Sequence, residues 1–296
     1  MQTFQIFDTS TTKDIKAVIK KLAYLSFFYF VITQCAVIAA ERIISIGGSI
    51  TEILYEFNLQ DKIVAVDTTS QYPSDAQDKP NVGYMRTLSA EPIIALNPDL
   101  ILYLEGSGPA ETIDQLSQAG INMVMIPNEY SIEGVKNKVG LVADAVDMQE
   151  EGQQLISNIS AQEKQLNDYL SDIDQQANVI FIMMFDESSA MVAGKDTGAD
   201  NMISMAKGKN VVDNFKSYKP LGAESITQLA PDYVLTTERA VKSFNNKAEI
   251  LNTPLLKLTP AAENQNIIVM DELLLLGYSP RVVNATNQLA EELHSQ

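Results

Sequence analysis

Residues 86–102 read RTLSAEPIIALNPDLIL, and residues 219–235 read KPLGAESITQLAPDYVL. The two stretches begin 133 residues apart, and 8 of their 17 positions are identical. In each stretch, apolar residues three positions apart predict a short helix, Pro-Asp ends it, and the closing apolar residues begin a strand. The repeated helix–strand unit therefore predicts two related lobes.

The repeated stretches lie within a regular alternation of apolar runs and amphipathic segments. Such alternation is typical of strands buried in a mostly parallel sheet that helices cover on both faces. We therefore predict the α/β class, with two Rossmann-like lobes. The predicted strands span residues 43–46, 63–66, 100–104, 123–126, 179–184, 233–236 and 267–270, and the predicted helices span 51–57, 91–96, 110–118, 199–206, 224–229, 240–251 and 279–294.

A long helical segment separates the two copies of the repeat. Residues 131–174 contain no proline and no strand pattern, and their apolar residues recur at helical spacing with a break near Asp147. The sequence thus predicts an N-terminal α/β lobe over residues 41–145, a backbone helix over 146–175 and a C-terminal α/β lobe over 176–296.

The N-terminus has the pattern of an export signal. Four lysines precede Leu22, the next 19 residues carry no charge, and small residues end the run before Glu41. This order is typical of a secretory signal peptide, which we predict over residues 1–40. A retained membrane anchor is the alternative, because 19 apolar residues can cross a bilayer. A lipoprotein signal at Cys35 is disfavoured, because the usual small residues do not precede that cysteine.

The composition excludes several classes of function. The chain has 296 residues, with 21 Lys and Arg against 38 Asp and Glu, and its net charge of −17 disfavours binding to nucleic acid. Cys35 and His294 are its only cysteine and histidine, which excludes an internal disulfide and a Cys/His zinc cluster. A Ser-His-Asp triad would need its base from the C-terminal tail. The methionines at positions 183, 184, 191, 202 and 205 are interpreted as core packing.

The stretch SIGGSITE, residues 45–52, follows the first predicted strand and opens a helix. It matches neither of the glycine-rich patterns that bind phosphate groups. Ser49 and Glu52 have the spacing of a capping box, so the stretch predicts a tight strand–helix turn that is capped by its own side chains.

Four side chains are candidates for ligand binding. Tyr84 stands in VGYMR, two residues before Arg86, and a nearby guanidinium favours the phenolate, which is a ligand suited to ferric iron. Arg86 and Arg239 lie near the carboxyl ends of predicted strands, where ligand carboxylates are met. Arg281 follows LLGYSP. The alternatives are a surface tyrosine and solvated arginines.

The repeat also contains Glu91 and Glu224 at equivalent positions, each at the start of a predicted helix. A carboxylate there stabilises the helix dipole, which is one explanation. The other is a symmetric pair of exposed carboxylates, one on each lobe, that a two-fold partner recognises.

Five motifs together resemble the haem-binding periplasmic proteins of bacterial ABC importers. They are DTTSQYP (67–73), VGYMRTLSAE (82–91), MVAGKDTGADNMI (191–203), YKPLGAESI (218–226) and LLGYSPR (275–281). The resemblance covers about residues 41–294 and implies a class III binding protein, related to cobalamin and siderophore binders, whose lobes are joined by a rigid helical backbone.

The resemblance implies a role for each candidate residue. Tyr84 would be the ligand of the haem iron, with Arg86 ordering it, and Arg239 and Arg281 would lie near the propionates. Glu91 and Glu224 would dock onto a two-fold ABC permease with its ATPase in the inner membrane. The cargo would be haem b, with an outer-membrane haem receptor as a compatible upstream partner.

Residues 185–189 depart from the family, because some members carry a histidine ligand there and this chain has Phe-Asp-Glu-Ser-Ser. We therefore expect five-coordinate iron, or a weak sixth ligand such as water. The predicted function is periplasmic haem binding for iron uptake, without catalysis. The alternatives are cobalamin or a ferric siderophore as cargo, and an exported α/β enzyme.

Overall fold

The computed structural model describes residues 40–186 and 188–294 of the chain. The predicted signal peptide, and with it the alternative of a retained anchor, lies outside the described residues except for Ala40. Within the described ranges, no helix is both long enough and apolar enough to cross a membrane.

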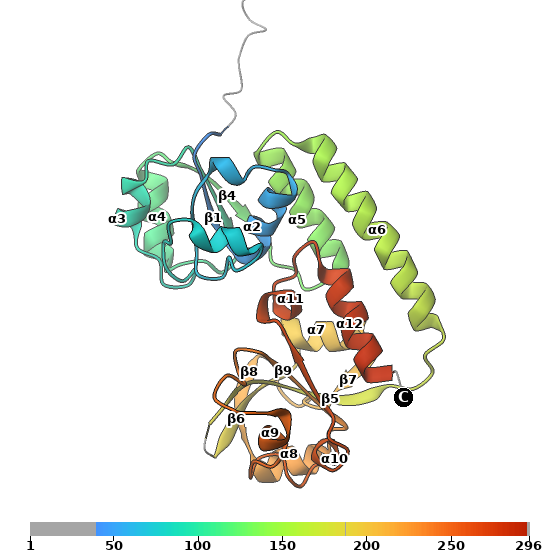
Figure 1. Ribbon diagram of the computed structural model, residues 1–296. Helices are drawn as coiled ribbons and strands as arrows, with labels where there is room; N and C mark the ends of the chain where they lie inside the picture. Colours follow the sequence, from blue (N-terminus) through green and yellow to red (C-terminus); the bar gives the residue numbers. More distant parts are fainter. Residues whose placement is uncertain (1–39, 187, 295–296) are drawn as a thin grey trace, which may run out of the picture. The chain divides into compact units, whose positions relative to one another are not determined.

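The first lobe contains a parallel four-stranded sheet in the order β2-β1-β3-β4. Helices α2 and α5 lie on one side of this sheet, and α3 and α4 on the other (Figure 1). The strands are β1 (Ile43–Ile46), β2 (Ile63–Val66), β3 (Leu100–Leu104) and β4 (Asn122–Ile126), and the helices are α2 (Gly48–Glu56), α3 (Ala90–Ala95), α4 (Ala110–Gln118) and α5 (Ile132–Ala145), with 3₁₀ turns η1 (Gln60–Lys62) and η2 (Ser74–Asp78). The sequence predicted all four strands, because each is a short apolar run between turn residues.

The second lobe contains a mixed sheet in the order β10-β9-β5-β6-β8, with β7 also paired to β5. Its strands are β5 (Ala177–Phe185), β6 (Ser189–Ala193), β7 (Gly208–Asn210), β8 (Tyr218–Gly222), β9 (Tyr233–Thr237) and β10 (Ile267–Met270). Its helices are α7 (Gly198–Met205), α8 (Ala223–Leu229), α9 (Lys247–Leu251), α10 (Pro260–Glu263), α11 (Glu272–Leu276) and α12 (Val282–His294). Together with the first lobe, this sheet confirms the predicted α/β fold with two lobes.

The two copies of the repeat form the same unit in the two lobes. One copy forms α3 and β3, and the other forms α8 and β9. The repeated aspartates have the same task, because each accepts a hydrogen bond from a backbone N–H at the start of the neighbouring strand. Asp99 accepts from Arg42 at 3.0 Å, and Asp232 accepts from Asn178 at 3.2 Å. The repeat is therefore structural as well as sequential.

Helices α5 and α6 (Gln149–Ser171) form the long helical segment. The break falls where the sequence predicted it, at Asp147, whose φ of 58° lies in the left-handed region. The Lys136 ammonium of α5 links the two helices by an ion pair with Glu163 of α6 at 2.6 Å, and it also pairs with Glu133 of its own helix at 3.5 Å.

Several elements of the second lobe differ from the prediction. Strands β6 and β8 pair antiparallel and lack the long apolar run of a buried parallel strand. Helix α9 is shorter than predicted, because the Asn246 side chain accepts a hydrogen bond from the Glu249 N–H and starts the helix there. The last helix, α12, begins only at Val282, because Tyr278 has a positive φ of 48° and Pro280 follows it.

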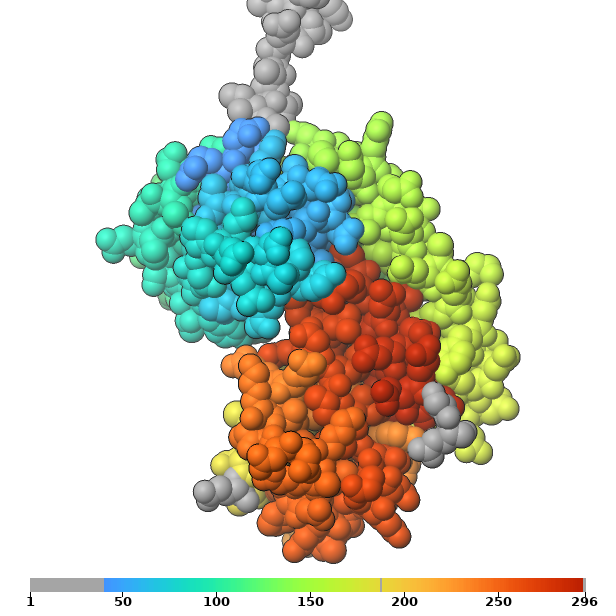
Figure 2. Space-filling model, viewed as in Figure 1, coloured from blue at the N-terminus to red at the C-terminus, as the bar shows by residue number. Residues whose placement is uncertain are grey.

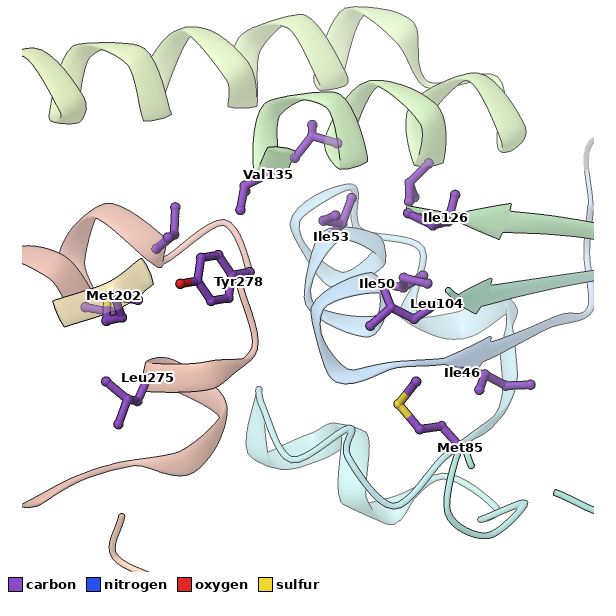
Figure 3. Close-up of a cluster of buried hydrophobic side chains, with 14 of the residues drawn as sticks. Ile46, Ile50, Ile53, Met85, Leu104, Ile126, Val135, Met202, Leu275 and Tyr278 are labelled. Atoms are coloured by element: carbon purple, nitrogen blue, oxygen red, sulfur yellow. The ribbon is translucent and has the colours of Figure 1, made fainter. Parts of the chain in front are cut away.

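Alternate residues of β5 point into two different hydrophobic cores. Val179 and Phe181 belong to a cluster that also contains residues of α7, α12, α5 and the first sheet. Ile180 and Ile182 belong to a second cluster with α8, α9 and α10. The first cluster thus continues from one lobe into the other. Figure 3 shows Tyr278 within it, between Met202 and Leu275 on one side and Ile50 and Ile53 on the other.

Candidate ligand-binding site

The loop that carries Tyr84 is fixed at the carboxyl edge of the first sheet. The Thr68 N–H, just after β2, donates to the Gly83 carbonyl at 3.0 Å, and the Gly108 N–H, after β3, donates to the Met85 carbonyl at 2.9 Å. The side chain of Met85 is buried. Gly83 has a φ of 95°, which a side chain would strain. The loop thus holds its backbone firmly at the edge where α/β folds bind ligands.

Tyr84 itself points away from the core. Its side chain is 45% exposed, and its polar neighbour Arg86 is exposed as well. Neither the Tyr84 hydroxyl nor the Arg86 guanidinium has a hydrogen-bond partner among the residues that the structure describes. The segment around them is coloured cyan to teal in Figure 2 and lies at the surface. The phenol and the guanidinium are therefore available to a ligand.

The turn between β1 and α2 is closed by side chains from the loop after β2. The Gly47 N–H donates to Asp67 Oδ1 at 2.9 Å, and the Gly48 N–H donates to Thr69 Oγ1 at 2.9 Å. The predicted capping box is wrong, because α2 has no side-chain cap of its own, and Ser49 and Glu52 point elsewhere. The amides that could have bound an anion are already satisfied, as expected for a tight turn without a phosphate site.

In the second lobe, Arg239 and Met184 lie at the carboxyl ends of neighbouring strands. Arg239 follows β9, is exposed, and forms an ion pair with Glu272 at 3.4 Å. Met184 is near the end of β5, and its side chain is 57% exposed, so it is not the core residue that the sequence indicated. Met202 is fully buried, as predicted. An exposed thioether and a cationic side chain at the ends of neighbouring strands can contact the apolar and the carboxylate parts of one ligand.

Arg281 lies in different surroundings from the other two arginines. Its Nε and Nη2 atoms donate to the two carboxylate oxygens of Glu52, each at 2.9 Å. The Glu52 side chain is 1% exposed, and it also accepts a hydrogen bond from the Ser279 hydroxyl at 2.9 Å. The guanidinium carbon lies 3.6 Å from the centre of the Tyr72 ring. A propionate contact for Arg281 stays a prediction, and the structure gives this arginine an internal partner.

Lys138 on α5 is a buried cation that the sequence did not single out. Its ammonium donates to the Ser49 hydroxyl and to the Tyr278 carbonyl, both at 3.0 Å. Burial lowers the pKa of Lys138 to about 7, although the nearby Glu52 carboxylate opposes this shift. Only the apolar spacing of α5 was visible in the sequence, and a lysine on its inward face gave no signal of its partners.

Glu91 and Glu224 stand in the first turns of α3 and α8, and both side chains are exposed. Neither α3 nor α8 has a side-chain cap at its N-terminus. Glu224 accepts a 3.5 Å hydrogen bond from Gln228 of its own helix. Among the residues that the structure describes, neither carboxylate has an ion-pair partner.

A groove of about 310 Å³ lies between α6 and α12. It contains none of the predicted site residues. Its lining residues are Gln162, Gln165, Leu166, Val283, Asn284, Asn287, Gln288 and Glu291. His294, near the end of the same helix α12, hydrogen-bonds through Nε2 with the Ala206 carbonyl at 3.0 Å. The described ranges hold no cluster of three His, Cys, Asp or Glu side chains that could bind a metal ion.

Comparison with known proteins places this arrangement among binding proteins. A family model described as periplasmic binding protein matches residues 43–274. A solved structure of the periplasmic heme-binding protein BhuT in complex with two hemes is 33% identical, with a TM-score of 0.82 over 85% of this chain and 97% of that one. The ABC transporter substrate-binding lipoprotein YvrC of Bacillus subtilis, itself uncharacterised, is 26% identical over 86% of this chain and 80% of its own length. A vitamin B12-binding protein of Vibrio campbellii is 25% identical over 86% of this chain and 90% of its own length.

Proposed function

Because the chain belongs to the periplasmic binding protein family, we propose that it is an exported protein that binds haem b and delivers it to the permease of an ABC importer for iron uptake. It carries its cargo without catalysing a reaction. The likeness to BhuT supports haem as cargo, and the likeness to YvrC supports the role in an ABC importer.

The proposal rests on one observation, which is the exposed and unengaged phenol of Tyr84 on a rigid loop. Phenolate is a known ligand of haem iron. Because the loop backbone is hydrogen-bonded to the segments after β2 and β3, the phenol is held ready for a ligand and loses little freedom on binding. In this proposal the Arg86 guanidinium, two residues along the same loop, orders the Tyr84 ligand.

The second lobe supplies complementary groups. Met184 offers an exposed apolar surface for the porphyrin, and the Arg239 guanidinium can bind a propionate. Residues 185–189 contain no histidine, so the iron bound by Tyr84 is five-coordinate or takes water as its sixth ligand.

Glu91 and Glu224 are the proposed contacts with the permease. They occupy equivalent positions in the two copies of the repeat, and both are exposed and without an ion-pair partner in the described chain. Two carboxylates on related lobes suit a permease with two-fold symmetry and basic side chains, and charge complementarity would guide the docking.

Cobalamin is the second candidate cargo, and the vitamin B12-binding relative supports it. The two cargoes make different demands on Tyr84. Haem iron needs an axial ligand from the protein, which Tyr84 supplies in this proposal, whereas the cobalt of cobalamin already carries ligands and needs no phenolate. A variant that lacks only the Tyr84 hydroxyl therefore distinguishes the two.

The test is an absorption titration of the purified protein with ferric haem and, separately, with cyanocobalamin. We expect saturable binding of haem with the visible spectrum of a high-spin tyrosinate complex. Tyr84→Phe should lose that spectrum and weaken binding, whereas Tyr169→Phe, an exposed tyrosine on α6, should match the parent protein. Binding of cyanocobalamin but not of haem would refute the proposal and make cobalamin the cargo.

A further inference from the structure

The two lobes are joined by a buried ion pair that the proposed cargo site does not use. Glu52 belongs to α2 of the first lobe, and Arg281 belongs to the segment between α11 and α12 of the second lobe. Two N–H groups of the guanidinium face both carboxylate oxygens, each at 2.9 Å, so the pair is bidentate. A bidentate pair fixes the orientation of the guanidinium relative to the carboxylate as well as the distance between them. It therefore holds two side chains that are 229 positions apart in the chain in one relative orientation.

The half-exposed Tyr72 side chain contacts the Arg281 guanidinium of this pair. The carbon of the guanidinium that binds Glu52 lies 3.6 Å from the centre of the Tyr72 ring. Tyr72 is 43% exposed and follows the segment of Asp67 and Thr69 that closes the turn before α2. A cation held against an aromatic face is attracted to it, and more strongly where water is excluded.

Burial makes the pair hard to break. Glu52 is 1% exposed, and the Arg281 side chain is 22% exposed. A movement that separated the lobes at this point would leave the carboxylate without its partner in a site that water does not reach, which is costly. The Ser279 hydroxyl, itself 1% exposed, donates to the same carboxylate and moves with the Arg281 segment. The contact therefore resists both separation and rotation of the lobes.

We propose that Glu52, Arg281 and Tyr72 form an inter-lobe clamp that holds the two lobes in the arrangement that binds cargo. In this proposal Arg281 is a positioning residue, and it acts on the cargo through the clamp instead of contacting a propionate. The effect on cargo affinity rests on the proposed function, whereas the effect on lobe motion does not.

The first experiment measures the lobes without cargo. Cys35 is the only cysteine, so a Cys35→Ser chain with Ser117→Cys on α4 and Ser225→Cys on α8 carries one spin label on each lobe. Both serines are exposed. Electron–electron double resonance then gives the distribution of inter-lobe distances. We expect Glu52→Gln and Arg281→Lys to broaden this distribution clearly relative to the parent chain.

Glu163→Gln is the matched control. It makes the same chemical change in another short ion pair, between α6 and Lys136 of α5, which does not join the two lobes. This control should leave the distance distribution unchanged. Tyr72→Leu is the second clamp variant, and it should also broaden the distance distribution. Because the Tyr72 ring is half-exposed, this variant keeps the test available if Glu52→Gln fails to fold.

The second experiment separates positioning from direct contact with the cargo. Ferric haem and its dimethyl ester differ only at the propionates, which are anionic carboxylates in haem and neutral methyl esters in the dimethyl ester. If Arg281 acts through the clamp, Arg281→Lys weakens both by the same factor, at least about tenfold, chiefly through faster dissociation. A loss confined to haem with free propionates would overturn the proposal, as would unchanged distance distributions in Glu52→Gln, Arg281→Lys and Tyr72→Leu. If the protein binds no haem, the proposed function fails, and the distance measurement still decides on the clamp.

Discussion

Replacement of Lys138 by methionine should change how the stability of the protein depends on pH. The folded protein releases the Lys138 proton near pH 7, because burial lowers its pKa, whereas the unfolded chain keeps the proton up to about pH 10.5. Between these values the unfolded state binds more protons, so the folded state gains stability as pH rises. Below pH 7 both states are protonated, and the contribution no longer changes.

The structure sets the size of the effect. Each pH unit in this window raises the free energy of unfolding by about 1.4 kcal/mol where one proton separates the two states. The gain is smaller near pH 7, because Lys138 is only half deprotonated there in the folded state. From pH 7 to pH 9, the parent protein should therefore gain about 2 kcal/mol relative to Lys138→Met. The charges around Lys138 agree with this direction, because Glu52 and Arg281 already neutralise one another, and the closest partners of the ammonium are a hydroxyl and a carbonyl.

The assay is urea unfolding of both proteins, without cargo, followed by tyrosine fluorescence at several pH values between 6 and 9. The chain has 11 tyrosines and no tryptophan, which makes this signal suitable. Lys136→Met is the matched control on the same helix. The hydrogen bond with Glu163 raises the pKa of Lys136, so this lysine stays charged in both states and its replacement should give a constant difference. A constant difference for Lys138→Met as well would refute the reasoning.

Three further predictions concern docking and local structure. Replacement of Glu91 and Glu224 together by glutamine should lower cargo uptake by cells at least about tenfold and leave cargo affinity unchanged, as uptake and titration assays would show. A loss of affinity would mean that the two carboxylates are structural caps. Ala230→Gly should raise the melting temperature and stabilise the protein by about 1 kcal/mol. Ala230 ends α8 in the left-handed region, with a φ of 45°, where a Cβ is strained and glycine is not. Gly48→Ala should destabilise it by about 2 kcal/mol in urea unfolding, because a Cβ there would overlap the Thr69 carbonyl oxygen. An unchanged melting temperature or an unchanged urea midpoint would contradict these two predictions respectively.

Local patterns predicted most of the fold because most of its elements are locally determined. The strand at residues 100–104 is buried on both faces, so its sequence is an unbroken apolar run that ends at turn residues. The break at Asp147 was visible for a similar reason, since the apolar spacing changes there. Strand β8 gave no such signal, because it lies at the edge of the sheet, contains Pro220 and has few buried residues.

The candidate site was predictable only in part, because its partners are far apart in the chain. Ser49 and Glu52 have the local spacing of a capping box, and nothing near them in the sequence indicates otherwise. In the structure, Glu52 is committed to Arg281 and Ser49 to Lys138, over separations of 229 and 89 positions. A buried carboxylate needs a charged partner, and a bidentate bond with a distant guanidinium is stronger than a hydrogen bond with a backbone N–H at the helix start. The local capping interaction is therefore not formed.

The structure also gives an argument for Tyr84 that does not depend on its motif. A phenolate ligand must be accessible and must ionise, and burial opposes both. Burial raises the pKa of Tyr218 to about 12 and raises that of Tyr278 still further, so neither can serve. Of the described tyrosines, only Tyr72, Tyr84 and Tyr169 are exposed, at 43%, 45% and 38%. The Tyr72 ring is covered on one face by Arg281, and Tyr169 lies on α6 near its C-terminal end, away from the carboxyl edges of the sheets. Tyr84 alone among these combines exposure, a rigid loop and a neighbouring arginine, which is why the titration with Tyr84→Phe is the decisive test of the cargo.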